Sequence, residues 1–190
     1  MDIGLYFGSF NPIHTGHLII AQHFLNETPL RQVWFVVTPQ NPFKASSSLL
    51  NEYQRLHLVH LGIGDNPGLK ASDVEFHLPR PSYTSVTLAY LGEKFPQHRF
   101  SLLMGSDSYQ NVGNWHNADF ILRNYPIYIY ERPGFPVSAG SERATVLQAP
   151  FLAISASGIR ELLLERKPIT YLVPLAVEAE IEKSNYYRGG

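Results

Sequence analysis

Strand patterns alternate with helical patterns along almost the whole chain, and this alternation constrains the fold more than any other feature. Short runs rich in apolar, β-branched and aromatic residues predict strands at 3–7, 33–38, 71–76, 100–104 and 127–130. Helical periodicity predicts helices at 16–25, 51–61, 84–95, 117–123, 157–164 and 174–183. Prolines and glycines predict loops at 39–48 and 133–146. Because a helix between two strands returns the chain in parallel, we expect an α/β fold, an open parallel sheet with helices on both faces.

Composition limits the class of protein. A chain of 190 residues with 44% hydrophobic residues is expected to form a single domain, 1–190. It has no cysteine, which excludes disulfides, thiolate metal sites and a cysteine nucleophile. The 15 Lys and Arg residues against 16 Asp and Glu argue against a nucleic-acid surface, which needs a basic patch. Without a signal pattern or a membrane-length apolar stretch, the protein is expected to be soluble and cytoplasmic, with no membrane partner.

The segment GSFNPIHTGH, residues 8–17, lies between the first predicted strand and the first predicted helix. At such a junction the free N–H groups of the helix start favour an anion. His14 and His17 flank Gly16, so two imidazoles can converge on one phosphate chain while the glycine permits close approach to the backbone. The alternative is an ordinary strand-to-helix turn with two surface histidines. The complete string favours a nucleotide phosphate site.

This segment resembles the HxGH signature of the nucleotidyltransferase superfamily, and GSFNPIHTGHL is similar to the form in bacterial nicotinate-nucleotide adenylyltransferases. Ser9 stands where the family usually has Gly or Thr, and Asn11 stands for the usual Asp. Both departures leave the two histidines intact. The resemblance extends over nearly the whole chain and implies a Rossmann-like fold.

Two further motifs resemble the pyridine-nucleotide site of this family. PSYT, residues 81–84, precedes a helix for which Thr84 is a suitable N-cap, and the family binds the pyridine carboxylate there through backbone amides. GSD followed by a tryptophan resembles the family's glycine, aspartate and tryptophan spacing. Gly105 would permit close approach, Asp107 would accept hydrogen bonds from ribose hydroxyls, and Trp115 would stack on a pyridine ring. On its own, Trp115 is more typical of a partly buried core aromatic.

Three basic residues follow predicted strands or open a predicted helix. Lys44 ends a proline-rich stretch similar to the family's, although a lone loop lysine is as often merely solvated. Arg132, in an RPG turn, either reaches a phosphate or braces the turn, and the sequence does not decide. In ISASGIR, Ser157 is the expected N-cap, which places Arg160 in the first helical turn. A cation is disfavoured there unless it meets a bound phosphate, so Arg160 is a candidate to grip the outer phosphates of ATP.

The resemblance implies transfer of AMP from ATP to nicotinate mononucleotide, which gives nicotinate adenine dinucleotide and pyrophosphate by direct displacement, in NAD biosynthesis. The implied catalytic residues are His14, His17 and Arg160. The implied ATP site comprises Gly8, Ser9, Phe10, His14, His17, Gly105, Asp107, Ser157, Ile159 and Arg160. The implied mononucleotide site comprises Lys44, Tyr83, Thr84, Trp115, His116 and Arg132. Mg²⁺ should arrive with the ATP phosphates, without a dedicated protein metal site.

Several alternatives remain open at the level of sequence. The acceptor is alternatively nicotinamide mononucleotide or another phosphorylated compound such as phosphopantetheine, because the first motif is shared across the superfamily. A dinucleotide-dependent oxidoreductase would need GxGxxG after the first strand, which this chain lacks. A non-catalytic nucleotide sensor could use the same fold. Association into a homo-oligomer is also left open.

Overall fold

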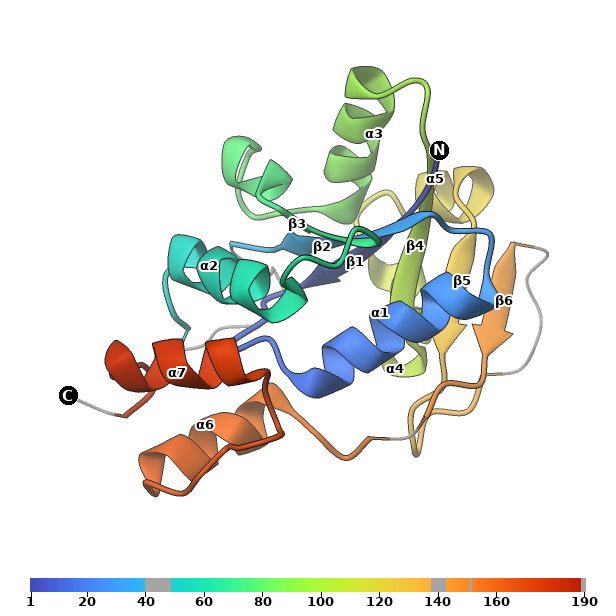
Figure 1. The fold of residues 1–190 in the computed structure, drawn as a ribbon. Helices are drawn as coiled ribbons and strands as arrows, with labels where there is room; N and C mark the ends of the chain where they lie inside the picture. The colour runs from blue at the N-terminus through green and yellow to red at the C-terminus, as the bar shows by residue number, and fades with distance from the viewer. Residues whose placement is uncertain (40–48, 138–142, 151, 189–190) are drawn as a thin grey trace.

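A computed structural model describes every residue except 40–48, 138–142, 151 and 189–190. Its centre is a six-stranded sheet in the order β3-β2-β1-β4-β5-β6, and every pair of neighbouring strands is parallel (Figure 1). The strands are β1 (Asp2–Gly8), β2 (Gln32–Val37), β3 (Leu69–Ser72), β4 (Arg99–Gly105), β5 (Ile127–Tyr130) and β6 (Ala144–Leu147). The open parallel α/β sheet expected from the sequence is confirmed.

Helices cover both faces of this sheet (Figure 1). The α-helices are α1 (Thr15–Glu27), α2 (Glu52–Ile63), α3 (Thr84–Lys94), α4 (Ser106–Tyr109), α5 (Ala118–Asn124), α6 (Ala156–Leu164) and α7 (Leu175–Lys183). Two 3-10 helices, η1 (Val74–His77) and η2 (Val112–Asn114), accompany them. In Figure 1, α1, α2, α6 and α7 lie below the sheet and α3 and α5 above it. None of the helices in the described part of the chain is long and apolar enough to cross a membrane.

The two faces of the sheet belong to two separate hydrophobic cores because successive strand side chains point to opposite sides. On β2, Phe35 packs into the core under α1 and α2, whereas Trp34 and Val36 pack into the core under α3 and α5. Both cores contain fully buried strand residues, so the sheet is apolar on both sides. This double burial fixes the register of the strands and the position of the loops that follow them.

The strand order reverses direction between β1 and β4. These two strands pair as neighbours although β2, β3 and the helices that accompany them lie between the two in sequence. In open parallel sheets, ligands bind beyond the carboxyl ends of the strands at such a switch point. Gly8 ends β1 and Gly105 ends β4. The structure therefore places the two glycine motifs on either side of the expected ligand crevice.

Two sequence expectations about the sheet were wrong. The third strand covers Leu69–Ser72 rather than 71–76, because the chain turns out of the sheet at Asp73, whose carbonyl accepts a hydrogen bond from the Phe76 N–H. The expected loop at 133–146 ends in β6, an edge strand of four residues. None of the four is fully buried, so β6 lacks the apolar run that marks the inner strands.

Candidate active site

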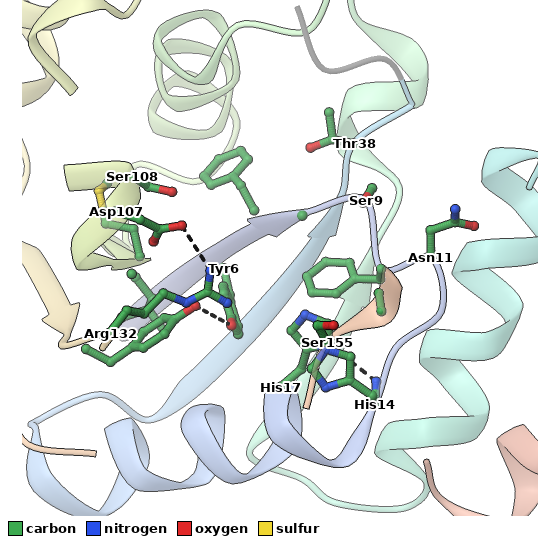
Figure 2. A pocket seen from close by; sticks show the side chains of 18 of the residues that line it. Tyr6, Ser9, Asn11, His14, His17, Thr38, Asp107, Ser108, Arg132 and Ser155 are labelled. Atoms are coloured by element: carbon green, nitrogen blue, oxygen red, sulfur yellow. Dashed lines mark hydrogen bonds and ion pairs between the residues drawn. The ribbon is translucent and has the colours of Figure 1, made fainter. Parts of the chain in front are cut away.

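A first cavity of about 380 Å³ lies at the carboxyl ends of β1 and β4. Figure 2 shows His14 and His17 on one side of it and Asp107 and Arg132 on another. Predicted residues that line it are Gly8, Ser9, Phe10, His14, His17, Gly105, Asp107, Trp115, Arg132, Ser157 and Arg160. Segments that are more than a hundred residues apart in the chain thus converge on one volume. Asn11, Thr38 and Ser155 line the same cavity.

The two histidines of the first motif form a stacked pair. Their ring centroids are 3.6 Å apart with an interplanar angle of 22°, and His17 Nδ1 accepts a hydrogen bond from the His14 backbone N–H at 3.3 Å. Gly16 lies against the His14 ring, where a Cβ would come within 3.1 Å of Nδ1. A side chain at residue 16 would therefore require the His14 ring to shift by a few tenths of an ångström.

Both histidines are held in the neutral form. Burial, with a smaller contribution from the charge of Arg132, lowers the pKa of His14 to about 4 from its ordinary value of 6.5. Burial also lowers the pKa of His17 well below its ordinary range, aided by His14 and Arg132. Nδ1 of His14 is buried and has no hydrogen-bond partner among the described residues. An anion placed here would favour protonation of an imidazole, and its oxygens would then accept hydrogen bonds from the ring N–H groups.

The loop between β1 and α1 is held from below by aromatic packing. Phe10 has a positive φ of 45°, an uncommon conformation for a bulky residue, and its side chain is 2% exposed. Its ring packs edge-on against Phe35 and His17, with centroid distances of 5.4 Å and 5.1 Å. An added Cβ at Gly8 would come within 2.9 Å of that ring. The Phe10 side chain thus packs against His17, and the role of Phe10 in ATP binding stays a prediction.

Arg160 reaches the first motif from α6. Its guanidinium donates to the Asn11 carbonyl at 2.7 Å and to the Ser157 hydroxyl at 3.2 Å. The expectation that Ser157 caps this helix was wrong: the N-cap is Ser155, whose hydroxyl accepts from the Gly158 N–H. Arg160 therefore lies beyond the first turn of α6. The repulsion between its positive charge and the positive end of the helix dipole is then weaker than the sequence suggested. Its position in the cavity wall rests on the hydrogen bond to Asn11 instead.

Asp107 and Arg132 form an ion pair across the cavity. Arg132 donates to Asp107 Oδ2 at 2.9 Å, and its backbone N–H donates to the Ser106 hydroxyl (Figure 2). Gly105 leaves room for this pair, since a Cβ there would lie 2.5 Å from Asp107 Oδ1. Arg132 thus braces its turn and also lines the first cavity, the one that contains the histidines, rather than the second cavity described below. Its side chain is 47% exposed.

A second cavity of about 600 Å³ adjoins the first. The predicted residues Tyr83, Thr84 and His116 line only this cavity, whereas Trp115, Asp107 and Gly8 line both. The rings of Tyr83 and His116 stack with centroids 4.5 Å apart, and the Ser85 hydroxyl is 2.9 Å from His116 Nδ1. The shared wall makes one continuous crevice with two compartments.

The start of α3 forms part of the second compartment. Thr84 is the first helical residue and Tyr83 is the N-cap, so the expectation that Thr84 caps this helix was wrong. No side chain caps it in the described structure. An uncapped helix start leaves N–H groups and the positive end of the helix dipole available to an anion. The anion site at this turn stays a prediction, with Tyr83 rather than Thr84 as the N-cap.

Sequence reasoning missed Arg55, which is fully buried. Its guanidinium donates to the carbonyls of Ser9 at 2.6 Å, Thr38 at 2.9 Å and Leu50 at 2.9 Å. It therefore ties the phosphate loop to the end of β2 and to the start of α2. The signal was present in the helical spacing, because Arg55 occupies the same buried face of α2 as Leu58 and Val59.

Among the described residues, one predicted site residue does not line either cavity. Ile159 is 1% exposed and belongs to the hydrophobic core below the sheet, and its N–H bonds the Ser155 carbonyl. The structure therefore does not bring it to the site. Lys44 falls within 40–48 and lies outside the described residues. The expected loop at 39–48 lies there too, apart from Pro39.

A crevice at the switch point of a parallel sheet, lined by a glycine loop, imidazoles and guanidinium groups, defines a nucleotide-binding α/β protein. Residues 5–162 match the cytidylyltransferase-like family, and the chain belongs to this family. This confirms the superfamily resemblance of the HxGH segment.

Curated relatives and a solved structure refine the comparison. The chain is 47% identical to a probable nicotinate-nucleotide adenylyltransferase of Flavobacterium psychrophilum, over 99% of this chain and 100% of the relative. It is 49% identical to a protein of the same name from Cytophaga hutchinsonii, over 98% of both chains. Its fold is similar to that of Plasmodium falciparum nicotinic acid mononucleotide adenylyltransferase complexed with NaAD. In that comparison the TM-score is 0.82 at 21% identity, over 98% of this chain and 97% of the other.

Proposed function

We propose that this protein transfers AMP from ATP to nicotinate mononucleotide and releases pyrophosphate. The observation that carries this assignment is the two-compartment crevice: one compartment holds the HxGH histidines, and the other holds an uncapped helix start beside Trp115. Relatives that match the whole chain carry the name of this activity, which supports the same assignment.

The triphosphate of ATP belongs in the first compartment. His14 and His17 face it from α1 and its N-cap, and Arg160 faces it from α6. A triphosphate placed there would accept hydrogen bonds from the imidazoles, and its charge would raise their pKa values. A guanidinium can grip two phosphate oxygens at once, which a lysine cannot reproduce. These groups would neutralise the negative charge that grows on pyrophosphate as it leaves.

The mononucleotide belongs in the second compartment. Trp115 offers a flat apolar face for the pyridine ring, and the N–H groups at the start of α3 suit its carboxylate. Its phosphate would then lie near the shared wall that Gly8 and Asp107 form. From there a phosphate oxygen can attack the α-phosphorus of ATP while the bond to pyrophosphate breaks. The reaction needs alignment and charge stabilisation, not a protein nucleophile.

A divalent cation, Mg²⁺ by our proposal, would accompany the ATP phosphates. Among the described residues no three His, Asp or Glu side chains gather as a ligand set. Mg²⁺ commonly keeps several waters and binds phosphate oxygens with few protein ligands, so the first compartment suits a cation carried by the substrate. The cation would supply charge neutralisation on the transferred phosphates. The residues of this chain would position the phosphates around it.

The experiment that tests this function identifies the product. Purified protein is incubated with Mg-ATP labelled at the α-phosphate and with nicotinate mononucleotide, and the products are separated by chromatography. We expect the label in nicotinate adenine dinucleotide, with one pyrophosphate released for each dinucleotide formed. Label that remains in ATP under conditions where ATP binding is measurable would favour the nucleotide sensor instead.

A further inference from the structure

The second compartment contains a buried carboxyl group, Glu75, that no sequence motif assigned. Glu75 is 1% exposed and lines the cavity from η1. Its Oε1 accepts a hydrogen bond from the Thr87 hydroxyl at 2.8 Å. Its Oε2 has no hydrogen-bond partner among the described residues, and the same holds for the buried hydroxyl of Ser82, which lines the same cavity. The compartment therefore ends in polar groups with unused hydrogen-bonding capacity.

The charged groups around Glu75 do not neutralise it. Asp107 and His116 line the same cavity. Asp73, the N-cap of η1, pairs with His77 at 3.3 Å. From α2, the Arg55 guanidinium bonds the Thr38 carbonyl rather than the Glu75 carboxylate. Burial raises the pKa of Glu75. The Thr87 hydroxyl that donates to Oε1 opposes that rise, as do the nearby hydroxyls of Thr38 and Ser82, although Oε2 and the Ser82 hydroxyl do not reach hydrogen-bond geometry. A buried carboxyl without a cationic partner favours its neutral form, which carries a proton to donate.

We propose that Glu75 is a specificity-determining residue that donates a hydrogen bond, as a neutral carboxylic acid, from Oε2 to the carboxylate of the pyridine mononucleotide. This inference rests on the proposed function. The two oxygens of a carboxylate only accept hydrogen bonds, and the groups offered here are donors: the first N–H groups of α3, the Ser82 hydroxyl and protonated Glu75. An amide would turn its NH₂ toward one of these donors and leave it unpaired, at a cost in affinity. An ionised Glu75 would instead repel the acid and accept from the amide.

The test compares nicotinate and nicotinamide mononucleotides as acceptors across the pH range in which the enzyme stays folded. The ratio of their KM values cancels the titration of the phosphate that they share. Because the proton must be present for donation, wild type should prefer the acid most strongly at low pH. That preference should fall at least fivefold as pH rises through the Glu75 pKa. Glu75→Gln keeps an N–H donor that does not titrate, so its ratio should stay flat with pH. Glu93→Gln makes the same change at an exposed position of α3 and should follow wild type.

A second variant, Glu75→Leu, removes the hydrogen-bond donor but keeps a side chain of similar size. Glu75→Leu should raise KM for nicotinate mononucleotide at least tenfold and change KM for the amide by less than threefold, with kcat nearly retained. A wild-type preference for the acid that rises with pH, or equal effects of Glu75→Leu on both acceptors, would overturn the role of Glu75 and leave the proposed function intact. No product from nicotinate mononucleotide with wild-type enzyme would overturn the proposed function itself. If Glu75→Leu does not fold, the pH profiles of wild type and Glu75→Gln decide.

Discussion

The stacked rings of His14 and His17 lie so close, with centroids 3.6 Å apart, that a proton on either one disfavours a proton on the other. Burial and the nearby Arg132 act in the same direction. The two histidines are therefore neutral before substrate binds, and the negative charge of a bound phosphate would raise their pKa values. The two histidines therefore carry no fixed positive charge, and a positive charge becomes favourable on them only when an anion is bound.

Removal of one imidazole should affect turnover more than binding. We predict that His17→Ala lowers kcat by about a hundredfold or more, the range observed when one transition-state donor is removed. The measurement is the steady-state rate of pyrophosphate release at saturating substrates. His57→Ala removes an exposed imidazole from α2 and should leave kcat unchanged. A His17→Ala enzyme with near-normal kcat would contradict this role.

The lowered pKa of His14 makes the ligand-free protein less stable in acid. Its pKa is about 4 in the folded protein and 6.5 ordinarily, so the unfolded chain binds more protons between these values. The stabilisation is complete above pH 6.5 and is lost as pH falls toward 4. Between pH 7 and pH 4, wild type should lose about 3 kcal/mol more unfolding free energy than His14→Asn. Urea unfolding at several pH values measures this difference, and parallel curves for the two proteins would refute the assignment.

Arg160 should act mainly on ATP. We expect Arg160→Ala to raise KM for ATP by about 10- to 100-fold, because charge-assisted bonds to phosphate are lost, with a smaller effect on the mononucleotide. Arg160→Lys should restore only part of the affinity, since an ammonium lacks the planar fork. Arg166→Ala, an exposed change just beyond α6, serves as the matched control. A selective loss of mononucleotide affinity would mean that the two compartments have been exchanged.

Trp115 should act mainly on the mononucleotide. Trp115→Ala is expected to raise its KM by about tenfold, the effect of losing an aromatic stacking contact, while KM for ATP changes little. Trp115→Phe should recover most of the affinity because a ring remains. Tyr171→Ala removes an aromatic that is 84% exposed and should behave as wild type. An equal rise in both KM values for Trp115→Ala would indicate a structural role in the core instead.

The sequence predicted the inner sheet because its strands are continuous apolar runs with clear ends. It also predicted most of the crevice, since parallel strands bring their following loops to one edge. The sequence did not predict the edge strand β6, because this strand has no buried face and therefore no apolar run. The cap errors at Ser157 and Thr84 have a local cause. Several candidate N-caps lie within three residues of each other, and backbone geometry decides among them.

Buried polar residues were the main class that sequence reasoning missed. Arg55 interrupts an apolar helix face, and its carbonyl partners come from three segments that only the fold brings together. Glu75 follows a strand, like the predicted site residues, but its meaning depends on burial and on an oxygen without a partner. Helical spacing can indicate the burial of Arg55, but no spacing rule reports an oxygen without a partner. Such residues can be identified only in the folded structure, where the hydrogen-bond partners of each buried polar group are known.

The most direct test of the central claim is the rate of pyrophosphate release with Mg-ATP and each of three acceptors in parallel: nicotinate mononucleotide, nicotinamide mononucleotide and phosphopantetheine. The two-compartment crevice predicts rapid release with nicotinate mononucleotide, slower release with its amide and none with phosphopantetheine. Release with phosphopantetheine but not with nicotinate mononucleotide would contradict the account.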